Sequence, residues 1–296
     1  MESKEKKHHH FVPQVYLKNF AHTIEKKGNK DHYYVSTFDK IDEREESKTD
    51  IEKICLKKKL YTIDSDKRQE RESIENLYAN TIESDYPKFY NIITDEKKFN
   101  ISKEERGLII LTIINLQLRN PYLLNSINDF WMHLINTYNY PDPLNVFTEK
   151  GKILFPFETK SIDEIITDNK KENKQFFINE HLKLTFNLVK SHFNDIIFVD
   201  TDKSDVGFIT SDRPVLCNDI ASPFRLPINR NFMLTIMPNK ENIKYDISKI
   251  IRNNPFINAR TFNILQYENA TRQIIGLNLD DINLSKQDYI KIKNVI

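Results

Sequence analysis

Glycine is scarce in this chain, where only 5 of the 296 residues are glycine. Loops that cradle phosphate need glycine at fixed spacings, because the backbone must turn tightly and approach the ligand closely. Neither G-x-x-x-x-G-K-[ST] nor G-x-G-x-x-G occurs in the sequence. The P-loop and dinucleotide-binding classes are therefore excluded, and the fold has to be predicted from helix and strand patterns.

The charge balance is close to neutral, with 44 Lys and Arg residues against 43 Asp and Glu residues and a formal net charge of +1. General nucleic-acid binders usually carry a strong basic excess, so such a role would need a local basic patch. Hydrophobic residues make up 39% of the chain, and 19 Phe and 13 Tyr are among them. This composition predicts an ordered globular protein, which we treat as a single domain over residues 1–296.

Cysteine content and apolar runs predict the compartment. Two cysteines, Cys55 and Cys217, are too few for a four-thiolate zinc site or a small disulfide framework. The charged residues 1–10 lack the apolar stretch of a signal peptide, and no run reaches the roughly 18–20 apolar residues of a spanning helix. We therefore expect a protein of the reducing cytoplasm without a membrane partner.

The N-terminal third is predicted to begin with a short helix and a β-ribbon. Pro13 suits the start of a helix, and the apolar residues that follow recur at helical spacing as far as Phe20. Residues 33–38 and 54–63 are rich in β-forming side chains and are separated by a polar stretch at 39–50. We expect these two segments to pair with each other.

Helices are predicted for the middle of the chain. Apolar residues from position 74 to Phe89 fall three or four apart, and Pro87 inside this run predicts a kink. Ser102 and Glu105 have the capping-box spacing of a helix that should run to about Asn120, before a second long helix at 123–138. Residues 140–174 are expected to form an irregular insertion.

The last third is predicted to be mostly β, so the expected fold class is α+β with a helical core and a mixed or antiparallel sheet in the C-terminal half. The predicted strands lie at 196–200, 207–210, 214–216 and 232–237, and the predicted helical segments lie at 176–193, 247–252 and 255–267.

The helix that begins at Ser102 carries two polar residues with opposite orientations. Wound at about 100° per residue, it places Arg119 on a polar face and Gln117 on an apolar one, about 160° apart. A buried amide needs hydrogen-bond partners, so Gln117 either bonds nearby backbone or lines an internal site. At most one of the two residues can face a common cleft, and we favour Gln117.

Two acidic residues and a histidine cluster could take part in chemistry. Glu75 and Glu83 are eight residues apart and border the apolar stripe of their helix, where they could share a metal, divide acid and base roles, or simply face solvent. His8, His9 and His10 cannot all point at one centre, because successive side chains diverge. One or two of them could serve a site, unless they are the remnant of a tag.

The segment from Thr210 to Pro214 offers a further candidate site at a strand end. Asp212 supplies an acid and Arg213 a guanidinium fork that suits phosphate, next to Ser211. The same residues also form a good turn, because Ser and Asp side chains bond their own backbone. The sequence leaves both interpretations open.

Taken together, these motifs resemble a known family. His9-His10-Phe11-Val12-Pro13-Gln14, followed by Tyr16-Leu17 and Phe20, is similar to the N-terminal signature of the bacterial family named domain of unknown function 4238. Its other landmarks come in the same order over roughly residues 8–275: Glu75 and Glu83, Gln117-x-Arg119-x-Pro121, and Thr210-Ser211-Asp212-x-Pro214. The resemblance implies that the histidines belong to the protein, whereas Arg213 stands where a small polar residue is expected.

The first functional hypothesis is a bacterial hydrolase that cleaves phosphodiester bonds in nucleic acid or a nucleotide, as a nuclease of a toxin or anti-phage defence module. It requires a divalent metal ion with Glu75, Glu83 and His10 as ligands. The catalytic set would be His9, His10, Glu75, Gln117 and Asp212, and the substrate-binding set Arg119, Ser211 and Arg213.

The second hypothesis is a non-enzymatic recognition module, in which the same His, Glu, Gln and Asp residues form a buried structural network. Near-neutral charge and the lack of a strong ligand spacing suit it. Under either hypothesis the apolar N-terminal helix must bury its face, so its leading histidines enter the same interior. We therefore expect His9 or His10 within reach of Glu75, Gln117 or Asp212.

Overall fold

The N-terminal motif is built into the interior of the protein. The computed structural model describes residues 8–62, 72, 75–76, 78–121, 185–202, 204–218, 222–239, 244–252 and 258–294. Strand β1 (His8–His10) leads into helix α1 (Gln14–Leu17), which Pro13 precedes as N-cap, and a 3-10 turn η1 (Lys18–Phe20). Tyr16, Leu17 and Phe20 are completely buried. As expected, the apolar face of this segment is covered.

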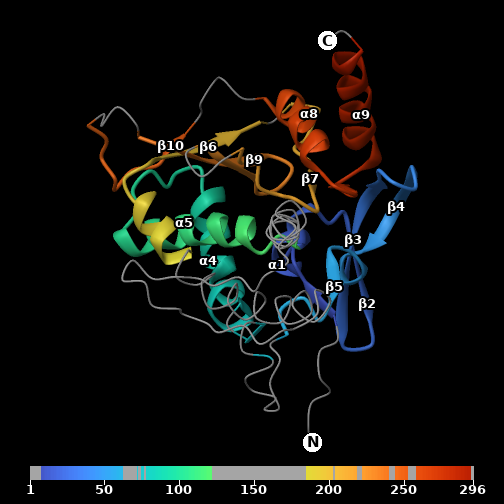
Figure 1. Ribbon diagram of the computed structural model, residues 1–296, viewed down its shortest axis with the longest axis horizontal. Helices are drawn as coiled ribbons and strands as arrows, with labels where there is room; N and C mark the ends of the chain where they lie inside the picture. Colours follow the sequence, from blue (N-terminus) through green and yellow to red (C-terminus); the bar gives the residue numbers. More distant parts are fainter. Residues whose placement is uncertain are drawn as a thin grey trace, which may run out of the picture.

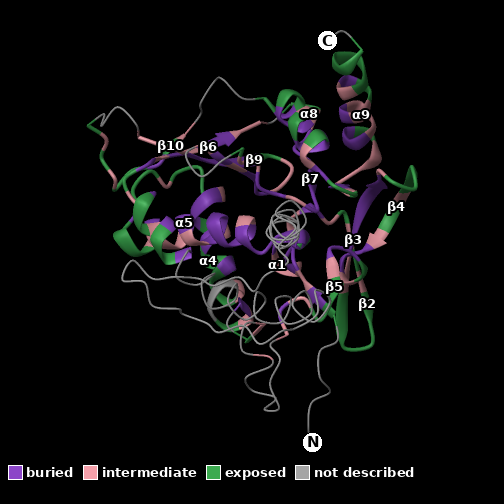
Figure 2. Ribbon diagram, in the orientation of Figure 1, coloured by how far each residue is buried: buried purple, intermediate pink, exposed green. Residues whose placement is uncertain are grey.

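A five-stranded antiparallel sheet surrounds strand β3 (Lys30–Asp39), which pairs with β2 (Thr23–Lys27), β4 (Arg44–Asp50) and β11 (Gln273–Gly276) (Figure 1). Strand β7 (Thr210–Ser211) continues the sheet from β11. The sheet therefore joins the two ends of the chain. Figure 2 shows much of β3 as buried and the β2 hairpin as exposed.

The predicted pairing of residues 33–38 with 54–63 is wrong. Strand β3 pairs instead with β4, which lies inside the polar stretch that we had expected to separate two strands. Most β4 side chains face solvent, so this strand lacks the apolar alternation that predicts one. The 54–63 segment contributes only β5 (Leu56–Lys58), preceded by the 3-10 turn η2 (Ile51–Lys53), and β5 pairs with β1.

A four-stranded mixed sheet has the order β10-β6-β9-β8. It contains β6 (Ile196–Thr201), β8 (Phe224–Pro227), β9 (Phe232–Met237) and β10 (Ile251–Arg252). The predicted strands at 196–200 and 232–237 are confirmed. The predicted helix at 247–252 is wrong, because Ile251 and Arg252 pair in parallel with β6, and this tertiary pairing overrides local preference.

Helices α4 (Ser84–Thr94) and α5 (Lys103–Leu118) pack beside this sheet (Figure 1). The predicted capping box of α5 is confirmed, since Ser102 and Glu105 exchange both side-chain-to-backbone bonds. Pro87 lies inside α4, directly after a π-helical turn at Tyr78–Glu83. The predicted helix at 74–89 therefore includes a wider turn than its sequence pattern indicates.

Two C-terminal helices cover the outer end of the five-stranded sheet (Figure 1). Helix α8 (Ala259–Asn269) corresponds to the predicted segment at 255–267, whereas α9 (Leu279–Lys293) was not predicted. The α+β class is thus confirmed. The predicted helix at 123–138, the insertion at 140–174 and most of the segment at 176–193 lie outside the described residues, although 185–191 is helical.

None of the helices within the described ranges combines the length and the apolar character that crossing a lipid bilayer requires.

Candidate functional site

His9 and His10 enter the structure through strand β1, which pairs antiparallel with β5. Alternation along the strand leaves His8 exposed and turns His9 inward, where it is 1% exposed. The Nδ1 atom of His9 accepts a hydrogen bond from the Tyr61 backbone N–H at 3.0 Å, and the two rings stack with centroids 5.8 Å apart. Neutral His9 therefore carries its proton on Nε2.

Arg119 connects β1 to the helices. Its Nη1 donates to Glu83 Oε1 and its Nη2 to the His10 carbonyl oxygen, both at 2.8 Å. The guanidinium lies 4.3 Å from the ring centroid of Tyr78 and 5.7 Å from that of Tyr61, whose hydroxyl donates to the Arg119 carbonyl at 2.7 Å. We call His9, His10, Tyr61, Tyr78, Glu83 and Arg119 the histidine–arginine cluster.

The electrostatics of this cluster follow from burial and proximity. Burial disfavours the charge of Arg119, but Tyr61, Glu83 and Tyr78 outweigh it, so the pKa of Arg119 rises above its ordinary value and the guanidinium stays charged. Burial raises the pKa of Tyr61 to about 12, which keeps its hydroxyl protonated. Burial also lowers the pKa of His10, with Arg119 acting in the same direction and Glu83 against it.

Of the two polar residues on α5, Arg119 is the one that contacts the histidines. Arg119 is the C-cap of α5, directly after Leu118, and its backbone is still helical, with its N–H donating to the Asn115 carbonyl at 2.9 Å. Gln117 is half-buried, and its side chain makes no hydrogen bond within the described part of the chain. We had expected Gln117 rather than Arg119 to face the site, whereas the contact with His10 is made by Arg119.

Glu75 lies next to the cluster: burial is the main cause that raises the pKa values of Tyr61 and Tyr78, and the charge of Glu75 adds to it. Its Oε2 atom is buried and, among the described residues, has no hydrogen-bond partner. The Nε atom of Arg119 is also buried and also has no hydrogen-bond partner among the described residues. Several buried polar atoms of the described residues share this property, and these two belong to the region of the histidine–arginine cluster, where a ligand could complete the bonding. The predicted contact between the histidines and Glu75 stays a prediction.

The segment from Thr210 to Pro214 is tied to the C-terminal part of the chain. Both Asp212 carboxylate oxygens accept backbone N–H groups, from Thr271 at 3.0 Å and Arg272 at 2.9 Å. The Ser211 hydroxyl donates to the Arg213 carbonyl and accepts from the Gln266 amide on α8. These bonds favour the turn interpretation of the motif over the substrate-binding one.

Replacing Asp212 by alanine should therefore destabilise the fold, because the backbone N–H groups of Thr271 and Arg272 lose their charged acceptor. We expect the free energy of unfolding to fall by about 1–3 kcal/mol, measured by urea denaturation. The control is Asp31→Ala, which removes an exposed carboxylate from β3. An Asp212→Ala protein with native stability but no activity would instead assign Asp212 to catalysis.

Three tyrosines connect these motifs, and sequence reasoning did not assign them to the site. The Tyr16 hydroxyl donates to the Pro227 carbonyl at 2.8 Å and bonds the Thr210 hydroxyl at 2.7 Å, joining the N-terminal motif to the Thr-Ser-Asp motif. A tyrosine within an apolar face is a detectable signal, because a buried hydroxyl needs a partner. Nothing in the sequence distinguishes Tyr61 and Tyr78 from other core aromatics.

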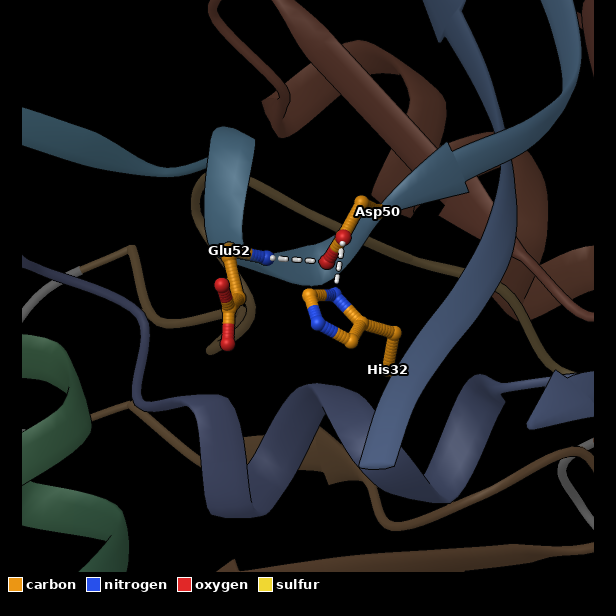
Figure 3. A group of neighbouring side chains, drawn as sticks. All are labelled: His32, Asp50 and Glu52. Atoms are coloured by element: carbon orange, nitrogen blue, oxygen red, sulfur yellow. Dashed lines mark hydrogen bonds and ion pairs between the residues drawn. The ribbon is translucent and has the colours of Figure 1, made fainter. Parts of the chain in front are cut away.

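Within the described ranges, one group of three side chains has the spacing of a metal site: His32, Asp50 and Glu52, whose ligand atoms lie within 4.8 Å of one another. Figure 3 shows the His32 ring directed at Asp50, with Nδ1 at 2.8 Å from Oδ2, and Glu52 beside them. Asp50 also accepts the Glu52 N–H at 3.0 Å, and Lys30 pairs with the Glu52 carboxylate. Lys30 therefore already places a positive charge next to these three side chains.

Comparisons with known proteins give one match. A family model described as "Protein of unknown function (DUF4238)" matches residues 8–280. The comparisons with curated proteins and with solved structures found no match.

Proposed function

Because the chain belongs to the family of proteins of unknown function DUF4238, its activity has to be inferred from its own residues, and we propose that it is a metal-dependent phosphodiester hydrolase. Its site would be the histidine–arginine cluster with Glu75. The observation that carries this proposal is the pair of buried atoms, Glu75 Oε2 and Arg119 Nε, for which the described residues supply no hydrogen-bond partner. A purely structural network would be expected to satisfy both.

The charges of the cluster suit a phosphodiester. The permanently charged Arg119 would stabilise negative charge that develops on the phosphate, with its orientation fixed by Glu83 and the His10 carbonyl. Glu75 and Glu83 would supply carboxylate oxygens to the divalent ion, and a neutral His10 imidazole can accept a proton from water. The Gln14 amide lies 3.3 Å from His10 Nε2 and helps to hold the ring.

The test compares Glu75→Gln and Glu83→Gln with Glu268→Gln, which changes an exposed carboxylate on α8. The metal-stripped full chain is supplied with Mg²⁺, Mn²⁺ or Zn²⁺, and hydrolysis of bis(4-nitrophenyl) phosphate, RNA and DNA is measured together with the melting temperature. We expect one ion to restore hydrolysis. The two cluster variants should lose at least about 100-fold in rate, and Glu268→Gln should lose nothing.

Two outcomes would redirect the proposal. No hydrolysis by the native chain with any ion, together with a lower melting temperature in both cluster variants, would support the recognition module instead. If Asp50→Asn loses the hydrolysis that the added ion restores, and the cluster variants keep it, the ion would be assigned to His32, Asp50 and Glu52 instead.

The pH dependence of the hydrolysis rate should identify the general base. Burial holds the pKa of His10 below its ordinary value of 6.5, although Glu83 partly opposes this. A general base works only when it is deprotonated, so the rate should rise with pH through a midpoint below 6.5 and then level off. His10→Gln should remove that acidic limb from the profile. A midpoint above 6.5 in the native protein would contradict the assignment of His10 as the base.

A further inference from the structure

The strand pair β1 and β5 carries a concentration of positive charge beside the candidate site. Residues 53–60 contain four lysines and no acidic residue, in a chain whose net charge is only +1. All four lysines are exposed: Lys53, Lys57, Lys58 and Lys59. Within the described part of the molecule, Lys57 and Lys58 form no ion pair, so their charge is available to a partner.

The register of the two strands shows how this charge relates to His10. His8 pairs with Lys58 and His10 with Leu56, and paired residues of antiparallel strands share one face of the sheet. The exposed His8 and Lys58 therefore lie on the same face as His10, about 7 Å further along the ribbon. Lys57 pairs with His9 and lies on the other face. Positive charge thus extends from the cluster on both faces.

The backbone of β5 is held in a strained form at both ends. Cys55 and Lys59 have φ angles of 52° and 51°, in the left-handed region that residues other than glycine rarely adopt. Bonds to the rest of the protein hold Cys55 in place: its N–H donates to Gln273 Oε1 at 3.2 Å, and its carbonyl accepts the Phe11 N–H at 2.9 Å. Such strain persists where the surrounding structure fixes it, so the lysines project from a defined strand.

We propose that the β1–β5 ribbon binds the sugar–phosphate backbone of a single-stranded nucleic acid and leads it to His10. This inference rests on the proposed function and narrows its substrate from phosphodiesters in general to a polymer. A mononucleotide offers its phosphate at one place, whereas a strand can place one phosphate at His10 and the next beside Lys58, about 7 Å along the ribbon. Contacts of this kind carry affinity without sequence preference, and they weaken as salt rises.

The experiment measures binding without turnover. Fluorescence anisotropy with labelled 20-nucleotide RNA and DNA is recorded in EDTA over a range of salt concentrations. It compares the native chain, Lys57→Gln/Lys58→Gln and the control Lys97→Gln/Lys103→Gln, which removes the same charge from exposed positions elsewhere. The ribbon variant should bind about tenfold more weakly, and its slope of log affinity against log salt should fall by about one unit, because Lys58 shares the face of His10 and Lys57 lies on the other. The control should match the native chain.

The readouts separate this inference from the proposed function. Because binding is recorded in EDTA, without turnover, binding by a native chain that shows no hydrolysis with any ion would leave the ribbon assignment standing and remove only the catalytic one. Equal affinities for the two lysine variants would overturn the ribbon. Binding to phosphatidylserine vesicles, but to neither oligonucleotide, would also overturn it and assign the lysines to a lipid surface.

Discussion

Replacing Arg119 by alanine is expected to lower the free energy of unfolding by about 3 kcal/mol, because the change leaves Glu83 without its cation and the His10 carbonyl without its donor. Arg119 is 1% exposed, whereas the Glu83 side chain is 26% exposed and can recover some hydration when its partner is removed. The expected loss of stability is therefore at the lower end of the range for a broken buried ion pair. Chemical denaturation at neutral pH measures it.

Arg44→Ala is the matched control, since its pair with Glu46 lies at the surface and should contribute less than about 1 kcal/mol. The double variant Arg119→Ala/Glu83→Ala should recover part of the loss, because no charge is then left unpaired. An Arg119→Ala protein that unfolds within 1 kcal/mol of the native protein would show that the ion pair does not hold the cluster together.

Deleting residues 1–20 should prevent folding altogether. Tyr16, Leu17 and Phe20 are completely buried, and burial of each large apolar side chain is worth about 1.5–3 kcal/mol. The summed loss approaches the whole stability of a typical domain, which is about 5–15 kcal/mol. Circular dichroism and thermal melting of the purified truncated chain provide the measurement, and a melting temperature equal to the native one would show the segment to be an appendage.

A point variant keeps this prediction measurable if the truncated chain is insoluble. Phe20→Ala should cost about 3–5 kcal/mol through lost burial and the cavity left behind. Phe99→Ala removes the same side chain from a position that is 52% exposed, and it should change stability by less than 1 kcal/mol.

Elements that depend on local signals could be predicted from the sequence. The capping box of α5 needs only Ser102 and Glu105, three residues apart, and both of its bonds form, at 3.0 and 3.2 Å. Strand β9 is an apolar run interrupted only by Thr235, and all but its last residue are buried. In both cases the determinants lie within a few residues of each other, so tertiary context does not change the outcome.

Elements that depend on distant partners could not be predicted. Strand β10 is only two residues long and forms because β6 lies beside it. Strand β4 has the sequence pattern of a polar linker because most of its side chains face water. The candidate site shows the same limit. Arg119 and Glu83 are 36 residues apart in sequence and meet only in the fold, and Tyr61 and Tyr78 contact the guanidinium through tertiary packing.

The pairing of β3 with β11 also sets the order in which the protein can assemble. Arg272 bonds Asp39 at 2.6 Å across a sequence separation of 233 residues, next to the strands that pair there. During synthesis the ribosome releases β3 long before β11 exists, so β3 waits with an unpaired edge. Contacts of such long range slow folding and leave nascent chains open to aggregation. We therefore expect folding to complete only after translation has passed β11, with chaperones protecting the first strands until then.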